Sequence, residues 1–208
     1  MTIMNCIVEY VDRVKYRVPI FTKVVYEYVK TIIPNVDKGV FNEYLARYAR
    51  RNSEFVRYQK GIYYKTLTTP FGRAGINYTE LVKMIYLTDG KEVFGYETGP
   101  SLMNKIGLTT QMPAYTYLVS ERARNTINDE EQLIIFKPVI KVNAENYRYL
   151  QFIDILDNRM KVNVEAKNAQ KILRNFIDKY NLNFETLLRY ARYYKNKGIF
   201  AMIAELAR

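Results

Sequence analysis

The chain has 208 residues, of which 49% are hydrophobic and 25% are charged, enough apolar material for a folded core. It contains no histidine and a single cysteine, Cys6. These two facts exclude Ser-His-Asp and Cys-His catalysis, histidine zinc sites and an intramolecular disulfide.

The positive charge is concentrated toward the N-terminus. The formal net charge is +11; residues 1–73 hold 13 Lys and Arg against 6 Asp and Glu, and residues 74–208 hold 19 against 15. A basic excess in one part of a chain indicates a polyanionic partner there, nucleic acid before a membrane surface. No apolar run approaches the roughly 20 residues of a membrane span, and a signal-peptide pattern is lacking. We therefore expect a cytoplasmic protein with no membrane partner.

Three helices and a hairpin are predicted in the first third. Apolar residues recur at helical spacing over residues 3–14 and again from about residue 22, and Asp37 is a suitable N-cap for a third helix that ends near Asn52. Two β-prone runs then flank Lys60-Gly61, which predicts a hairpin. This order is typical of a winged helix-turn-helix, which we place at residues 1–70 as a DNA-binding domain.

The second domain, residues 71–208, is predicted to be mixed α/β. The Pro- and Gly-bearing segment 66–75 is the predicted linker. Strands are predicted at 93–96, 114–120, 132–142 and 161–165, and helices at 78–86, 99–107 and 144–158, followed by two or three terminal helices with a break at 196–198. The expected fold class of the whole chain is therefore α+β.

The third predicted helix carries the strongest binding signal. Projected at about 100° per residue, it places Phe41 and Leu45 on one face and Gly39, Asn42 and Arg50 on the other. Asn and Arg can form bidentate contacts with adenine and guanine in the major groove. The candidate DNA-binding residues are Lys38, Asn42, Glu43, Arg47, Arg50 and Arg51 of this helix and Arg57, Gln59 and Lys60 of the hairpin.

Other functions of these side chains stay open at this point. A polar helix face can simply be solvated, charge at a hairpin can protect an edge strand, and arginines near a helix C-terminus favour its dipole. Arg189, Arg192 and Lys195 form a possible second basic surface on a C-terminal helix, for nucleic acid, for a partner protein or for solvent.

Catalytic signals are weak. Asp154 and Asp157 are spaced i, i+3 on a predicted helix but have no third carboxylate with metal-ligand spacing. Ser101, in Gly-Pro-Ser, matches no nucleophile motif and is predicted to cap a short helix. We therefore predict no catalytic residue, metal or cofactor, and no enzymatic activity.

The run Gly61-Ile-Tyr-Tyr-Lys, then Pro70-Phe-Gly, then Thr98-Gly-Pro-Ser through Gly107-Leu-Thr-Thr-Gln-Met-Pro resembles the AbiEi family. These are antitoxins of type IV toxin–antitoxin and abortive-infection systems. The resemblance covers about residues 5–140. It implies a DNA-binding autorepressor of the promoter of its own operon and a C-terminal antitoxin domain. It also implies a cognate nucleotidyltransferase-like toxin that is countered without the need for a stable complex. Independently of the resemblance, we expect an inverted repeat in the operator if two copies bind symmetrically.

Two other classes remain as alternatives. The second domain could act as an enzyme on nucleic acid or nucleotides, delivered by the winged helix. The chain could also be a plain transcription regulator whose second domain senses a ligand or dimerises.

Overall fold

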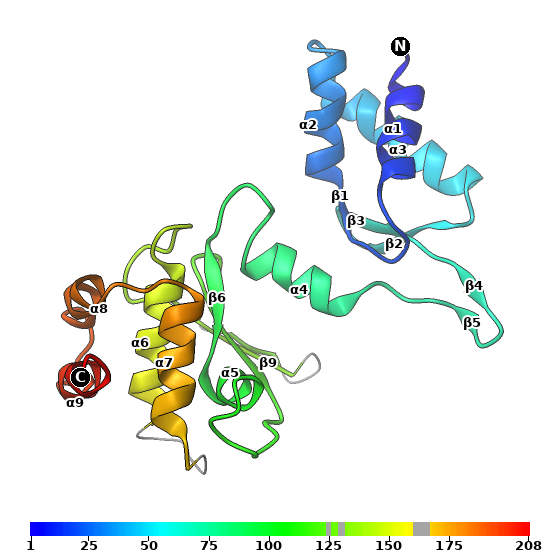
Figure 1. Cartoon of the computed structure of the whole chain (residues 1–208). Coiled ribbons are helices and arrows are strands. Elements are labelled where there is room, and N and C mark those ends of the chain that lie inside the picture. The colour runs from blue at the N-terminus through cyan, green and yellow to red at the C-terminus, as the bar shows by residue number, and fades with distance from the viewer. Residues whose placement is uncertain (124–125, 129–131, 160–166) are drawn as a thin grey trace. The chain divides into compact units, whose positions relative to one another are not determined.

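The computed structural model describes residues 1–123, 126–128, 132–159 and 167–208. The chain divides into two compact units, Met1–Val82 and Lys83–Arg208, which are called unit 1 and unit 2 (Figure 1). Helices and strands occur in both units, as expected of an α+β chain.

Unit 1 contains the three helices and the hairpin predicted from the sequence. Asp37 accepts a 2.9 Å hydrogen bond from the backbone N–H of Val40 and so caps the third helix. Gly61 has a φ of 81°, a left-handed conformation that suits glycine at the hairpin turn. The elements are α1 (Ile3–Arg13), α2 (Thr22–Ile32) and α3 (Lys38–Arg51), with β1 (Ile20–Phe21), β2 (Phe55–Gln59) and β3 (Ile62–Lys65) in the antiparallel order β1-β3-β2.

The core of unit 1 joins the helices to this sheet. Cys6 of α1, Val25 of α2 and Phe41 of α3 are fully buried together. The ring of Phe55 on β2 lies 5.1 Å from that of Tyr48 on α3. The hairpin is therefore fixed to α3 by direct packing.

The segment predicted as a linker forms a second, smaller hairpin. Strands β4 (Thr68–Thr69) and β5 (Gly72–Arg73) pair antiparallel. The base of this hairpin is bonded within unit 1, because the Thr66 hydroxyl donates to the Ala74 carbonyl at 2.7 Å and Arg17 Nε donates to the Gly75 carbonyl at 2.9 Å. These bonds explain why unit 1 extends past residue 70, where the sequence placed the division. Helix α4 (Tyr78–Tyr86) follows.

Among the described residues of unit 2, four strands form a sheet in the order β6-β7-β9-β8, in which β7 and β9 are parallel and the other neighbouring pairs are antiparallel. Strand β8 was not predicted. The strand expected over 132–142 ends at Phe136, because Pro138 cannot donate to a ladder, and the strand expected at 161–165 lies outside the described residues. The strands are β6 (Gly95–Thr98), β7 (Thr116–Ser120), β8 (Thr126–Asn128) and β9 (Leu133–Phe136).

Helix α6 (Tyr147–Arg159) lies at the centre of unit 2. It packs against β6 and α5, and α8 and α9 pack against it, so that Phe152, Ile153 and Leu156 are fully buried. The helices are α5 (Gly99–Lys105), α6 (Tyr147–Arg159), α7 (Ala169–Lys179), α8 (Phe184–Ala191) and α9 (Gly198–Leu206). Among the residues that the structure describes, no helix has both the length and the apolar character needed to cross a membrane.

Ser101 does not cap α5, contrary to the sequence prediction. The cap position belongs to Thr98, and Ser101 lies inside the first turn. Its hydroxyl donates to the Thr98 carbonyl at 3.2 Å and accepts a 3.0 Å hydrogen bond from the backbone N–H of Tyr117. This buried serine therefore ties α5 to β7 instead of capping the helix.

Candidate functional site

The exposed face of α3 carries the predicted DNA-binding residues. Phe41, Leu45 and Tyr48 are buried in the core of unit 1, which turns the opposite side of the helix outward. The predicted residues of this helix are all exposed: Lys38, Asn42, Glu43, Arg47, Arg50 and Arg51. Together they are called the α3 face. It presents four cationic groups, one carboxylate and one amide to solvent.

The tip of the β2–β3 hairpin adds a second group of exposed polar side chains. Arg57, Gln59 and Lys60 are exposed there. The register shifts between Arg57 and Gln59, and Arg57 Nε donates a 3.4 Å hydrogen bond to the Gln59 carbonyl. The bulge twists this part of the strand. The α3 face and the hairpin tip both belong to unit 1.

The second predicted basic surface is not continuous along one helix. Helix α8 ends at Ala191, so only Arg189 belongs to it, Arg192 stands at its C-cap, and Lys195 lies in the connection to α9. The prediction that these three residues lie on one C-terminal helix is wrong. Helix α8 thus ends five residues before the break predicted at 196–198. Of the three, Lys195 alone lines the cavity described next.

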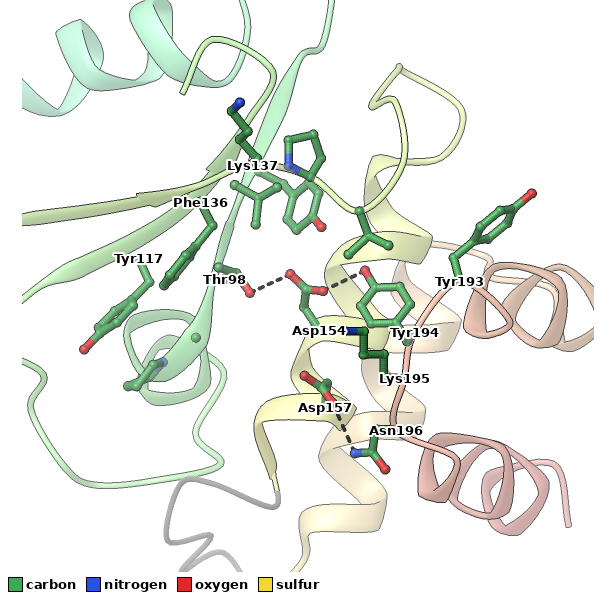
Figure 2. Close-up of a pocket in the computed structure, with 16 residues that line it drawn as sticks. Thr98, Tyr117, Phe136, Lys137, Asp154, Asp157, Tyr193, Tyr194, Lys195 and Asn196 are labelled. Atoms are coloured by element: carbon green, nitrogen blue, oxygen red, sulfur yellow. Dashed lines mark hydrogen bonds between the residues drawn. The ribbon is translucent and has the colours of Figure 1, made fainter. Parts of the chain in front are cut away.

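Unit 2 contains a cavity of about 780 Å³ between the sheet, α6 and the connection from α8 to α9 (Figure 2). Much of its wall is aromatic. The rings of Tyr117 on β7 and Phe136 on β9 are stacked, with centroids 6.5 Å apart and an angle of 19° between their planes. Phe136 is 45% exposed, although it is apolar. The aromatic lining residues are Tyr96, Tyr117, Phe136, Tyr193 and Tyr194.

Asp154 of α6 lies at the centre of the polar part of the wall (Figure 2). The Thr98 hydroxyl donates to its Oδ2 at 2.9 Å, and the Tyr194 hydroxyl donates to its Oδ1 at 2.7 Å. Burial raises the pKa of Asp154 to about 6, although hydrogen bonds from Tyr194, Thr98 and Tyr96 act in the opposite direction. Burial also raises the pKa of Tyr194 and of Tyr96, so both phenols stay protonated and remain donors.

Asp157 lies one turn further along α6 and also lines the cavity. Its Oδ1 accepts a 3.1 Å hydrogen bond from Asn196 Nδ2. Two lysines, Lys137 and Lys195, line the same cavity and are exposed. The cavity thus combines two carboxylates, two ammonium groups and aromatic rings.

The sequence placed Asp154 and Asp157 on one helix face but gave them no partners. The partners come from distant segments, since Thr98 precedes Asp154 by 56 residues and Tyr194 follows it by 40. One signal was present: Asp154 interrupts an otherwise apolar run on a buried helix, where an acidic side chain needs hydrogen-bond partners. Within the described ranges, no group of three or more His, Cys, Asp or Glu side chains could hold a metal ion.

No protein-family model matches this chain, and no curated protein sequence matches it. The resemblance to AbiEi antitoxins therefore rests on the motifs of the chain itself.

Proposed function

We propose that the chain is a DNA-binding protein that reads double-stranded DNA with the α3 face and the hairpin tip, in the manner of a winged helix-turn-helix. The observation that carries this proposal is the two-sided character of α3. Phe41 and Leu45 attach the helix to the core, while Asn42, Arg47 and Arg50 are exposed on its other side.

The residue types suit the two parts of such an interface. Side chains on the first turns of a recognition helix reach base edges, and Asn42 is in that position with its amide exposed. Arg57 and Lys60 at the hairpin tip are suited to phosphate contacts, which position a protein on DNA without reading its sequence. The Glu43 carboxylate would repel nearby phosphates, and at a base edge it would accept a hydrogen bond from cytosine N4 and so favour cytosine over other bases.

The biological role that we propose is that of an antitoxin and autorepressor of a type IV toxin–antitoxin operon. The AbiEi-like motifs support this role, and the division into two compact units is compatible with separate DNA-binding and antitoxin parts. Residues 71–208 would supply the antitoxin activity against a nucleotidyltransferase-like toxin, without a requirement for a stable complex. Cytoplasmic location follows from this proposal.

DNA binding is tested by fluorescence anisotropy with the full chain and a duplex from the region upstream of its own coding sequence. A scrambled duplex of equal length is the competitor. Arg50→Glu on the α3 face is expected to abolish the preference for the upstream duplex over the scrambled duplex. Lys91→Glu, which changes an exposed lysine of unit 2, is the matched control and should keep that preference. Equal binding of both duplexes by the unmodified chain would exclude sequence-specific recognition.

The antitoxin role is tested separately by co-expression. The product of the adjacent gene is induced with and without this chain, and growth is measured. Growth rescue that survives Arg50→Glu would assign the antitoxin activity to another part of the chain. The absence of rescue by the unmodified chain would contradict the antitoxin role while leaving DNA binding intact.

We also propose that the chain is not an enzyme, because it has no histidine and its carboxylate pair has no companion ligand among the described residues. The measurement is nucleotide turnover by the purified chain with Mg²⁺ present. Turnover above background that is lost in Asp154→Asn would favour the enzyme alternative.

A further inference from the structure

We infer that the cavity of unit 2 binds a mononucleotide, with its base against Phe136, a base N–H group at Asp154 and its phosphates at Lys137 and Lys195. This is a function beyond DNA binding, and it is carried by four observations on the cavity. They concern its size, its mixture of charges, its aromatic wall and its fixed carboxylate.

The cavity has the dimensions of a small-molecule site. Its volume of about 780 Å³ lies within the range of roughly 300–1,000 Å³ that ligand pockets usually have. A lone phosphate, an amino acid or a simple cation would leave most of this space unfilled. The size therefore favours a ligand that has a ring system and a polar extension.

The charges of the wall select a ligand with two different ends. Asp154 and Asp157 would repel a purely anionic ligand, and Lys137 and Lys195 would repel a purely cationic ligand. A nucleotide carries both kinds of group, because its base offers N–H donors to the Asp154 carboxylate and its phosphates attract the two ammonium groups. The exposed positions of the two lysines suit phosphates that extend toward solvent.

The aromatic wall supplies a surface for the base. Phe136 ends strand β9, stacks on Tyr117 and is still 45% exposed. An apolar ring held in place by a second ring, and left open toward a cavity, is a platform on which a base can stack (Figure 2). Every base has a flat π-face, so this contact contributes affinity without choosing among bases.

Asp154 supplies the fixed polar contact. The hydroxyls of Thr98 and Tyr194 each bond one of its oxygens, so the carboxylate keeps its direction at the wall. Burial disfavours the ionised form of this group and raises its pKa. A base N–H that donates to the carboxylate would offset part of that cost, which gives the ligand a contact that solvent-exposed carboxylates cannot offer.

The test is isothermal titration calorimetry of the full chain with GTP, ATP, CTP and UTP, with the four corresponding nucleosides, and with inorganic triphosphate. We expect at least one nucleoside triphosphate to bind with a submillimolar dissociation constant, more tightly than inorganic triphosphate or its own nucleoside. No heat with any nucleotide at millimolar concentration would overturn the inference. Inorganic triphosphate that binds as tightly as the nucleotides would overturn it as well.

Matched variants locate the site. Phe136→Ala should weaken nucleotide binding at least about fivefold, the lower end of a base–aromatic stack, whereas Ile127→Ala, an exposed apolar residue of β8 outside the lining, should not. Lys195→Ala should weaken binding of the nucleotide that the calorimetry identifies but not binding of its nucleoside, and the exposed Lys197→Ala, outside the lining, should change neither.

Asp154→Asn should weaken the same nucleotide and its nucleoside by the same factor. Because Asp154 is half-buried and hydrogen-bonded, circular dichroism must first show that the variant is folded; Phe136→Ala and Lys195→Ala, at exposed positions, decide the question if it is not. If Phe136→Ala and Lys195→Ala both bound the nucleotide as tightly as the unmodified chain, the nucleotide would bind outside this cavity and the inference would be overturned.

Discussion

The hydroxyl of Tyr194 donates a 2.7 Å hydrogen bond to Oδ1 of Asp154, across 40 residues of sequence. This bond joins the connection between α8 and α9 to the central helix of unit 2. It also orients a carboxylate whose pKa is raised to about 6 by burial. The free energy of unfolding of unit 2 should therefore depend on pH through the protonation of Asp154.

Asp154→Asn should change that pH dependence. With a folded-state pKa of about 6 against an ordinary 3.8, Asp154 holds more protons in the folded chain than in the unfolded chain between these values. Its contribution to the free energy of unfolding therefore falls as pH rises through this window, by about 3 kcal/mol in all. The asparagine variant should lack this fall. Urea unfolding at pH 4 and pH 7 measures it.

The matched control is Asp178→Asn, an exposed carboxyl on α7. It should leave the difference between the two pH values as in the unmodified chain. If Asp154→Asn tracks the unmodified chain at both pH values, burial of this carboxyl does not govern the stability of unit 2.

Asn42→Ala and Lys60→Ala should weaken DNA binding in different ways. Loss of a good bidentate base contact costs on the order of 1–3 kcal/mol on the cognate duplex only. Asn42→Ala should therefore reduce operator binding and leave scrambled DNA nearly unaffected. Lys60→Ala should weaken both duplexes alike and reduce the salt slope by about one. The measurement is a salt titration of both variants on both duplexes.

If Asn42→Ala bound the operator as tightly as the unmodified chain, another part of the α3 face would contact the bases. If neither variant differed from the unmodified chain on either duplex, unit 1 would not be the DNA reader.

Gly95→Ala should strongly destabilise unit 2. A Cβ at this position would overlap the backbone carbonyl oxygens of Tyr86, at the end of α4, and of Val119, which belongs to the β6–β7 ladder, and neither is the end of a flexible side chain. We expect a loss of more than about 2 kcal/mol, as for overpacked cores. Gly75→Ala, where a Cβ would meet nothing within 4 Å, is the control. Thermal unfolding compares the two, and equal midpoints would show that β6 can shift to make room.

The two units should fold as separate fragments. Helix α4 (Tyr78–Tyr86) crosses the limit between them, so each fragment needs the whole helix: residues 1–86 and residues 78–208. Each should give a cooperative thermal transition, and the first should bind DNA. A fragment ending at residue 65 should be less stable, because it lacks the Thr66–Ala74 and Arg17–Gly75 hydrogen bonds. Two fragments without cooperative transitions would show that the units depend on each other.

Local patterns predicted most of unit 1, because its elements are set by residues near one another in sequence. Helical spacing and the Asp37 cap predicted α3, and the turn glycine Gly61 predicted the β2–β3 hairpin. The second hairpin was missed, since its two-residue strands are too short for an alternating pattern to register. The pairing of Thr68 with Arg73 is visible only in three dimensions.

The cavity could not be predicted in the same way. Thr98, Asp154 and Tyr194 meet only after β6, α6 and the α8–α9 connection have packed together. Sequence spacing also gave the wrong position to Lys195, because it extended α8 past Ala191. The exposure of Asn42 on α3 was predictable because helical periodicity alone separates it from the buried stripe of Phe41, Leu45 and Tyr48.

The chain's single thiol offers a way to time the opening of unit 1 alone. Cys6 is fully buried between α1 and its neighbours, so a thiol-reactive dye can reach it only when that core opens. Labelling of the intact chain should be slow, should accelerate in denaturant, and should slow further with bound operator DNA, because a ligand of the folded state lowers the population of open molecules. Events confined to unit 2 should leave the labelling rate unchanged. The rate is followed by mass spectrometry, and fast labelling of the native chain would contradict the burial of Cys6.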